Sequence, residues 1–244
     1  MYRKRIIVLD LKNRSHTLLL CVAGGVFALA SVDALSQVSG NVVLISDYRF
    51  RGVSLSDGQA EPQVNLGYDG PSGWYAGVSG SGVELREGRD QQLIAYAGYS
   101  HKLASSLTWE LGVTNSAFLK TAGYHYAEAY AGLSFDEIGG RIYVSPNYFG
   151  QSMRTAYVEV NASHLIADRT HLLAHIGYLR SLSEADGSAF VPFSRFDALV
   201  GASASRGDWR LQLAWVAAIR TRAKYPLYGA RNSRALVLSA SYSF

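Results

Sequence analysis

The chain has 244 residues, which allows one large domain or two small ones. Only 17% of the residues are charged, whereas about a quarter is usual in soluble domains. The mean hydropathy of +0.03 is also far from that of a helical membrane protein. The composition therefore argues against both an ordinary soluble enzyme and a bundle of membrane-spanning helices.

The N-terminal segment is predicted to be a signal peptide. A basic head between residues 3 and 14 precedes an apolar run, 17–30, which is too short for a membrane-spanning helix. Small residues then offer a cleavage site after Ala34 or Ser36. We expect residues 1–36 to be removed and residues 37–244 to form one domain; an uncleaved N-terminal anchor is the alternative.

Removal of this segment would change the charge of the chain. Residues 37–244 hold 18 Lys and Arg against 17 Asp and Glu, so the net charge falls from +4 to +1. The electrostatic case for nucleic-acid binding disappears with the leader. Cys21, the only cysteine, is lost as well, so neither a disulfide nor thiol chemistry is expected.

The rest of the chain is predicted to form twelve β-strands. No apolar run reaches the 18 residues or so of a membrane helix, whereas apolar and polar residues alternate repeatedly, as Val64, Leu66 and Tyr68 do with their neighbours. Each segment has about ten residues, the length that a tilted strand needs to cross hydrocarbon. The expected strands are 40–51, 60–69, 73–82, 91–101, 106–115, 125–135, 140–149, 154–165, 169–180, 194–205, 208–220 and 233–244.

The connections between these strands differ in length in a regular way. Those after even-numbered strands are short, such as 70–72, and most of those after odd-numbered strands are longer, such as 83–90 and 116–124. The connection 150–153 is a short exception. Outer-membrane barrels have short periplasmic turns and longer outer loops, so the pattern indicates such a barrel. The loop 181–193 is a candidate to fold inward and narrow it.

Aromatic residues on the apolar face gather at both strand ends. Amphipathic rings favour the lipid headgroup level, so we expect two interfacial belts. The inner belt contains Tyr68, Trp74, Tyr99, Trp109 and Trp209, and the outer belt contains Tyr48, Phe50, Tyr148, Tyr178 and Phe196.

The last strand ends in an alternating pattern that closes on Tyr242 and Phe244. This resembles the C-terminal signature of bacterial outer-membrane barrels that the insertion machinery reads, so these two residues are predicted to be an assembly signal. Because hydrocarbon offers no hydrogen-bond partners, the first strand must pair with the twelfth. The predicted fold is an all-β, transmembrane, antiparallel up-and-down barrel.

One motif carries a family resemblance. The string from Ser46 to Gln59, SDYRFRGVSLSDGQ, together with GWYAGV at 73–78, resembles the TorF-type porins of proteobacteria, also called Gcw_chp proteins. The resemblance implies an outer-membrane barrel and a channel. It brings no catalytic residues.

The polar face of the strands is expected to line the lumen. The predicted pore-lining residues are Asp47, Arg49, Arg51, Asp69, Glu110, Glu128, Arg141, Glu159, Arg195, Asp197 and Arg210. Because both charge signs are present, opposed walls could create a transverse field that favours polar solutes. The alternative is that internal salt bridges fill and stiffen the lumen.

These observations predict a channel for passive passage of small polar solutes or ions in the outer membrane of a Gram-negative bacterium, reached through the periplasm. Its expected partners are outer-membrane lipid, the barrel-insertion machinery and the solutes, with no nucleic acid. The alternative is a non-conducting barrel for adhesion, envelope tethering or sensing.

An outer-membrane enzyme is a third, less favoured possibility. His171 and His175 lie four residues apart on a predicted strand, a separation of about 13 Å, which is too large for one metal ion. His125, near Ser116, has no evident catalytic partner. No catalytic, metal or cofactor site is expected.

Overall fold

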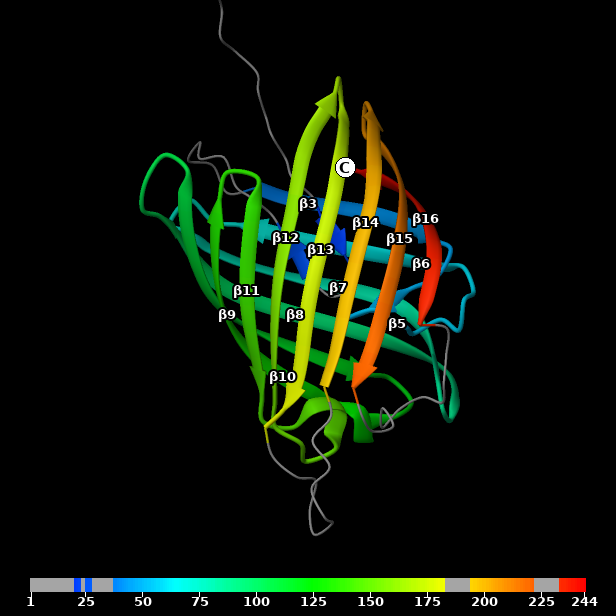
Figure 1. The fold of residues 1–244 in the computed structure, drawn as a ribbon. Helices are drawn as coiled ribbons and strands as arrows, with labels where there is room; N and C mark the ends of the chain where they lie inside the picture. Colours follow the sequence, from blue (N-terminus) through cyan, green and yellow to red (C-terminus); the bar gives the residue numbers. More distant parts are fainter. Residues whose placement is uncertain (1–19, 23–24, 28–36, 183–193, 222–232) are drawn as a thin grey trace, which may run out of the picture.

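The chain folds into a closed barrel of twelve antiparallel strands (Figure 1). The computed structural model describes residues 20–22, 25–27, 37–182, 194–221 and 233–244. The barrel strands are β3 (Gln37–Ile45), β6 (Glu61–Asp69), β7 (Trp74–Leu85), β8 (Gly88–Lys102), β9 (Leu107–Phe118), β10 (Tyr126–Phe135), β11 (Ile138–Ser145), β12 (Thr155–Ala167), β13 (Thr170–Ser181), β14 (Ser194–Arg206), β15 (Trp209–Thr221) and β16 (Arg234–Ser243). The predicted up-and-down barrel is therefore confirmed.

The wall closes where the first and last barrel strands meet, as predicted. β3 pairs with β16 in an antiparallel register that runs from Ile45↔Ser239 to Asn41↔Ser243. Every barrel strand consequently has two hydrogen-bonded neighbours. Such closure satisfies the backbone groups that an open sheet edge would expose.

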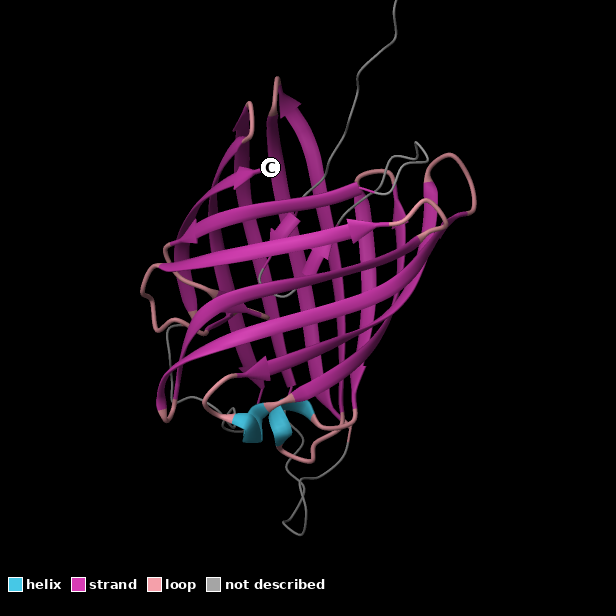
Figure 2. Ribbon diagram, turned by 180° about the vertical axis from the view of Figure 1, so that it is seen from behind, coloured by secondary structure: helices cyan, strands magenta, loops and turns pink. Residues whose placement is uncertain are grey.

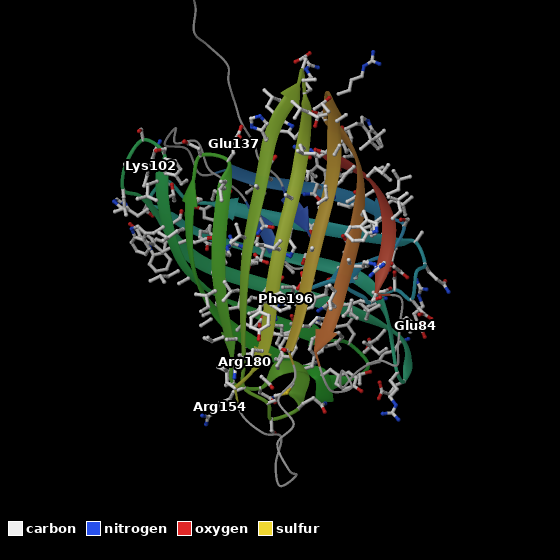
Figure 3. The ribbon with its side chains drawn as sticks, in the orientation of Figure 1. Glu84, Lys102, Glu137, Arg154, Arg180 and Phe196 are labelled. Carbon is white, nitrogen blue, oxygen red and sulfur yellow. The ribbon has the colours of Figure 1, made fainter. Side chains whose placement is uncertain are left out.

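The apolar residues of the wall point away from its centre. Leu111, Val113 and Leu213 are 48–57% exposed on the outer surface. Phe196 lies on this surface too, while the charged residues Lys102 and Glu137 lie toward one end of the barrel (Figure 3). Alternation places the polar neighbours of the apolar residues in the lumen. The outer surface is thus apolar, while the interior holds charged residues as well as buried apolar ones such as Leu173, Leu199 and Val237.

The two ends of the barrel differ. At the turn end, the connections 70–73, 103–106, 136–137, 168–169 and 207–208 are short. The opposite end, named the loop end here, contains the short 3-10 helices η1 (Ala122–Tyr124) and η2 (Tyr148–Gly150) (Figure 2). Within the described residues, no helix is both long and apolar enough to cross a membrane.

Two loop-end connections differ from prediction. Residues 83–90 were expected to be a long loop, but β7 and β8 continue into this segment and only Arg86 and Glu87 connect them. The seventh strand ends at Ser145 rather than at 149. Pro146 follows it, and proline has no N–H group for the ladder. The connection to β12 is therefore 146–154, and the expected short exception is wrong.

The first strand also ends earlier than predicted. β3 stops at Ile45, and the chain then forms a small hairpin from β4 (Arg49–Phe50) and β5 (Val53–Ser54). The candidate inward loop 181–193 lies mostly outside the described residues. So does the predicted signal peptide, apart from β1 (Leu20–Val22) and β2 (Gly25–Phe27), which pair with each other.

Candidate functional site: the barrel interior

The segment after β3 turns into the lumen and fills part of it. β4 and β5 pair through Arg49↔Ser54 and Phe50↔Val53, which leaves Arg51 and Gly52 as a two-residue turn. Their φ angles are 48° and 77°, as a type I′ hairpin turn requires. Residues 47–56 are all buried, and those with side chains are 0–5% exposed as whole residues. We name residues 47–56 the plug hairpin.

Asp47 holds the plug hairpin in shape. Its carboxylate accepts hydrogen bonds from Arg49 Nε at 2.6 Å and from Ser54 Oγ at 2.5 Å. The Tyr48 N–H donates to Ser56 Oγ at 2.9 Å. The bonds to Ser54 and Ser56 connect the two arms of the hairpin. The serine-rich motif therefore specifies a compact local structure rather than a longer wall strand.

The plug hairpin contacts the wall on several sides. Tyr48 Oη donates to Gln92 Oε1 on β8 at 3.0 Å, and the Glu84 N–H on β7 donates to the Leu55 carbonyl at 2.6 Å. At the hairpin tip, a Cβ atom on Gly52 would lie within 2.8 Å of side-chain atoms of Asp197 on β14 and Ala218 on β15. The hairpin therefore reaches between separate parts of the barrel wall.

Arg51 extends from the tip to yet another part of the wall. Its two terminal nitrogens donate to the two carboxylate oxygens of Glu128 on β10, at 3.0 and 2.7 Å. The guanidinium carbon lies 4.1 Å from the ring centre of Tyr157 and 5.3 Å from that of Tyr143. Paired hydrogen bonds and aromatic faces are both favourable for a guanidinium.

Aromatic residues fill the loop end of the lumen around the plug hairpin. The Phe149 ring lies 4.6 Å from that of Tyr126, 5.8 Å from that of Phe118 and 6.1 Å from that of Phe50. Tyr148 packs against Tyr126 at 5.2 Å. All five side chains are buried. The loop end is therefore packed like a protein core.

A second interior cluster lies on β7 and β9–β11. Arg141 forms an ion pair with Glu110, and Gly132 between them has no room for a Cβ atom. Tyr75 Oη donates to Glu110 Oε2 at 2.9 Å and lies 2.7 Å from Tyr130 Oη. The Glu110 carboxylate is therefore surrounded by donors, which is what a half-buried charge needs.

A third cluster joins β12, β13 and β14. His175 Nδ1 lies 2.7 Å from Asn161 Oδ1, and His175 Nε2 lies 2.8 Å from Asp197 Oδ1. Tyr157 Oη donates to the same Asp197 oxygen at 3.1 Å. From the sequence, His175 was considered only as a metal ligand together with His171. Its partners on adjacent strands could not be read from spacing along the chain.

The structure pairs many of the predicted pore-lining charges with one another. Asp47 with Arg49, Arg51 with Glu128, and Glu110 with Arg141 form ion pairs. Glu159 accepts a weak hydrogen bond from Tyr143, and Arg195 is buried on β14. Asp69 is half-buried at the turn end of β6, and Arg210 Nε donates to Ser205 Oγ at 3.3 Å. Many interior charges are thus paired in place, and a role in solute selection stays a prediction.

Three residues predicted for the outer lipid belt lie inside the barrel instead. Tyr48, Phe50 and Tyr148 are 0–4% exposed and belong to the packed loop end. The strand alternation that placed them outside does not apply, because β3 ends at Ile45 and β11 at Ser145.

The other predicted belt residues lie on strands of the wall. Tyr68, Trp74, Trp209 and Phe196 are exposed, while Tyr99, Trp109 and Tyr178 are half-buried. Their rings associate in groups, as Trp74, Tyr99 and Trp109 do at 5.3 and 5.7 Å, and Tyr178 and Phe196 at 4.4 Å. Tyr242 and Phe244 are exposed at the C-terminus.

Several residues of the packed loop end were not predicted from the sequence. Phe118 was placed in a loop, although it continues the lumen-facing positions of β9 beyond Ser116. Tyr126 shares the face of Glu128 and could have been identified by that alternation. Phe149 was expected at a strand end, and nothing in the sequence pattern indicated that its loop turns inward.

Comparisons with known proteins agree with the fold. A family model described as "Bacterial protein of unknown function (Gcw_chp)" matches residues 30–242. No curated protein matches the chain. Among solved structures, the KdgM porin is 10% identical, with a TM-score of 0.51 and coverage of 86% of this chain and 99% of that one. The NanC porin is 10% identical, with a TM-score of 0.52 and coverage of 85% and 98%. At this identity the similarity shows a shared β-barrel fold and nothing more.

Proposed function

This chain belongs to the Gcw_chp family of bacterial proteins, and we propose for it the function that its barrel supports best, a channel in a bacterial outer membrane. It conducts small polar solutes or ions, and its plug hairpin restricts the passage. Enzymatic activity is no part of this proposed function. The TorF-type porin designation that the motif suggested belongs to the same proposal.

The single observation that supports this function is the orientation of the wall. A closed sheet with exposed apolar residues outside and charged residues inside is stable in lipid and places charges where a polar solute would pass. A soluble twelve-stranded barrel would need the reverse, with an apolar interior too wide to fill well.

The location and assembly of the protein follow from the same proposal. Short turns face the periplasm in outer-membrane barrels, so the turn end is placed there and the packed loop end faces outward. Export would use the predicted signal peptide. The insertion machinery would recognise Tyr242 and Phe244, and outer-membrane lipid would contact the exposed wall.

One observation favours the alternative of a non-conducting barrel. The plug hairpin and the aromatic residues around it are almost completely buried, so the loop end has the packing of a structural core. A barrel closed permanently in this way could serve adhesion, envelope tethering or sensing through its outer loops.

Conductance in planar bilayers separates the two functions. The wild-type protein is compared with a plug-shortened variant, in which residues 47–56 are replaced by Gly-Ser-Gly-Ser. We expect low or intermittent wild-type conductance and stable, larger steps from the variant. If both folded proteins are indistinguishable from protein-free bilayers, the channel function is wrong and the non-conducting barrel is supported. Liposome swelling with sugars, amino acids and small anions then ranks the solutes.

A further inference from the structure

The residue at the tip of the plug hairpin is unusual for its backbone position. The turn places Arg51 at a φ of 48° and Gly52 at 77°. Asn, Asp and Gly are the residues that favour the first position of a type I′ turn, and a long side chain at positive φ costs conformational energy. An arginine here is therefore best explained by what its side chain binds.

Arg51 enters a site that the barrel itself builds. The Glu128 carboxylate on β10 accepts hydrogen bonds from both terminal nitrogens of the guanidinium. The side chains of Arg51 and Glu128 are only 4% and 5% exposed. Tyr143 on β11, Tyr157 on β12 and Tyr148 on η2 place their ring centres 5.3, 4.1 and 5.4 Å from the guanidinium carbon. We name these four barrel residues the guanidinium cage.

The chemistry of the guanidinium cage does not require that its ligand be part of the chain. A carboxylate that accepts two parallel N–H bonds matches the planar fork of a guanidinium. Aromatic faces add an attraction for any cation. An ammonium group lacks the fork and is more strongly hydrated, so it would bind in this site less well.

The cage also accounts for how the plug could be held and released. Withdrawal of the Arg51 side chain while the rest of the plug hairpin stays in place would leave the Glu128 charge buried without a counterion, which is strongly unfavourable. A solute that carries a guanidinium would supply that counterion. The plug hairpin could then leave without exposing an unpaired charge, because the solute takes the place of Arg51.

We propose that the guanidinium cage is a binding site for solutes that carry a guanidinium group, and that such solutes open the passage by displacing Arg51. This proposal rests on the channel function proposed above. It names the solute class and makes Glu128 a specificity-determining residue.

The binding site is tested first, with an Arg51→Ala variant of the full chain in detergent. Methylguanidinium, methylammonium and urea are the probes, and calorimetry and the thermal unfolding midpoint are the measurements. We expect methylguanidinium to bind Arg51→Ala about tenfold or more tightly than methylammonium and to raise its unfolding midpoint. Neutral urea at the same millimolar concentration should do neither.

Two matched variants locate the binding. Arg51→Ala combined with Glu128→Gln should lose the preference for methylguanidinium. Arg49→Ala removes the other buried plug arginine, whose partner Asp47 lies within the hairpin. It leaves Arg51 in the cage, with which the probe must compete, so methylguanidinium should bind Arg49→Ala more weakly than it binds Arg51→Ala. A folded Arg51→Ala protein that binds the two cations equally, or binds neither, contradicts the proposal.

The wild-type protein provides a test that does not depend on the folding of Arg51→Ala. In planar bilayers, methylguanidinium should increase the open fraction more than methylammonium does at equal ionic strength, and Glu128→Gln should abolish the difference. An equal response to both cations overturns the proposal. If the plug-shortened variant conducts but the wild type responds equally to methylguanidinium and methylammonium, the channel function stands and only the inferred ligand fails. If no variant conducts, the channel function fails, while binding to Arg51→Ala still tests the cage.

Discussion

Gly52 is the residue at which the plug hairpin meets the wall. A Cβ atom there would lie 2.6 Å from Asp197 Cβ and 2.8 Å from Ala218 Cβ, and the φ angle is +77°. Steric collision and backbone strain would therefore act together. Gly58, just after the hairpin, has a φ of +75° but no atom within 4 Å of its Cβ position. Alanine substitutions at the two glycines therefore separate the effect of backbone strain from that of steric collision.

Gly52→Ala is expected to displace the hairpin tip while the wall remains intact. Positive φ costs a non-glycine residue about 1–2 kcal/mol, and overpacking adds about 1–3 kcal/mol. We expect higher conductance and faster tryptic cleavage at Arg49 and Arg51 than in the wild type. Gly58→Ala introduces backbone strain without a steric collision, so the hairpin should stay in its wild-type position. Equal behaviour of the two variants would show that close contact at the tip does not hold the plug.

At the scale of single elements, the wall could be predicted and the plug could not. Every predicted barrel strand is present, because burial on one face only imposes period-two alternation along the chain. Residues 47–51 alternate as well, since Tyr48 and Phe50 separate Asp47, Arg49 and Arg51. A strand in the wall and a hairpin in the lumen share this local pattern. Only contacts with distant residues such as Gln92 and Glu128 distinguish them.

The turn at the hairpin tip could not be predicted from the sequence for a related reason. Arg-Gly is a weaker hairpin signal than Asn-Gly or Asp-Gly, so the reversal at Arg51 and Gly52 does not stand out in the sequence.

Of the predicted interior residues, Glu110 and Arg141 were placed on the correct face by alternation. Their pairing required the register across β10, which the sequence does not provide.

The seam between β3 and β16 depends on the last residue. Gly40 donates to the Phe244 carbonyl at 3.0 Å, and the Phe244 N–H donates to the Gly40 carbonyl at 2.9 Å. The Phe244 ring also covers Gly40, where a Cβ atom would lie 2.6 Å from it. Deletion of Phe244 should therefore weaken closure, by about 1 kcal/mol for each lost hydrogen bond.

Folding into lipid vesicles, followed by heat-modifiable mobility on gels, measures that effect. Deletion of Phe244 should fold most slowly, and Phe244→Ala, which keeps the backbone bonds, should be intermediate. Since no insertion machinery is present in this assay, the result reports the seam alone. Folding of the deletion variant at the wild-type rate would contradict a closing role for this residue.

A hydrogen bond at the loop end gives a pH-dependent contact between two elements. Tyr124 Oη on η1 donates to Glu87 Oε1, in the turn between β7 and β8, at 2.7 Å. Burial, followed by this hydrogen bond and the Glu87 charge, raises the pKa of Tyr124 to about 12. The contact therefore contributes fully below the ordinary tyrosine pKa of 10.0 and is lost as the pH rises through about 12.

Tyrosinate absorbance measures this pKa. The titration of Tyr124→Phe, subtracted from that of the wild type, isolates one transition among the 16 tyrosines. We expect its midpoint near 12 in the wild type and closer to 10.0 in Glu87→Gln. A transition that stays in place after Glu87→Gln would mean that burial alone causes the shift.

At the scale of the whole molecule, every functional conclusion depends on which face of the barrel wall is apolar and points outward. Two adjacent residues of a strand lie at nearly the same depth in the membrane, but their side chains point to opposite sides of the barrel wall. Val78 and Ser79 lie near the middle of β7; Val78 is exposed on the outer surface, and Ser79 is half-buried on the lumen face. Their backbones share the same stretch of ladder, so arginine at either position tests the surroundings of the side chain rather than the strand.

Val78→Arg should hinder folding into lipid vesicles, whereas Ser79→Arg should not. A charge on the lipid face near the bilayer midplane costs about 2–4 kcal/mol, but a lumen position remains in contact with water. Urea titration of the vesicle-bound proteins would give the difference in unfolding free energy. In detergent micelles, where headgroups lie closer to the side chain, the difference should shrink. If Ser79→Arg were the more damaging substitution, the apolar surface would face another protein or the barrel centre instead of lipid.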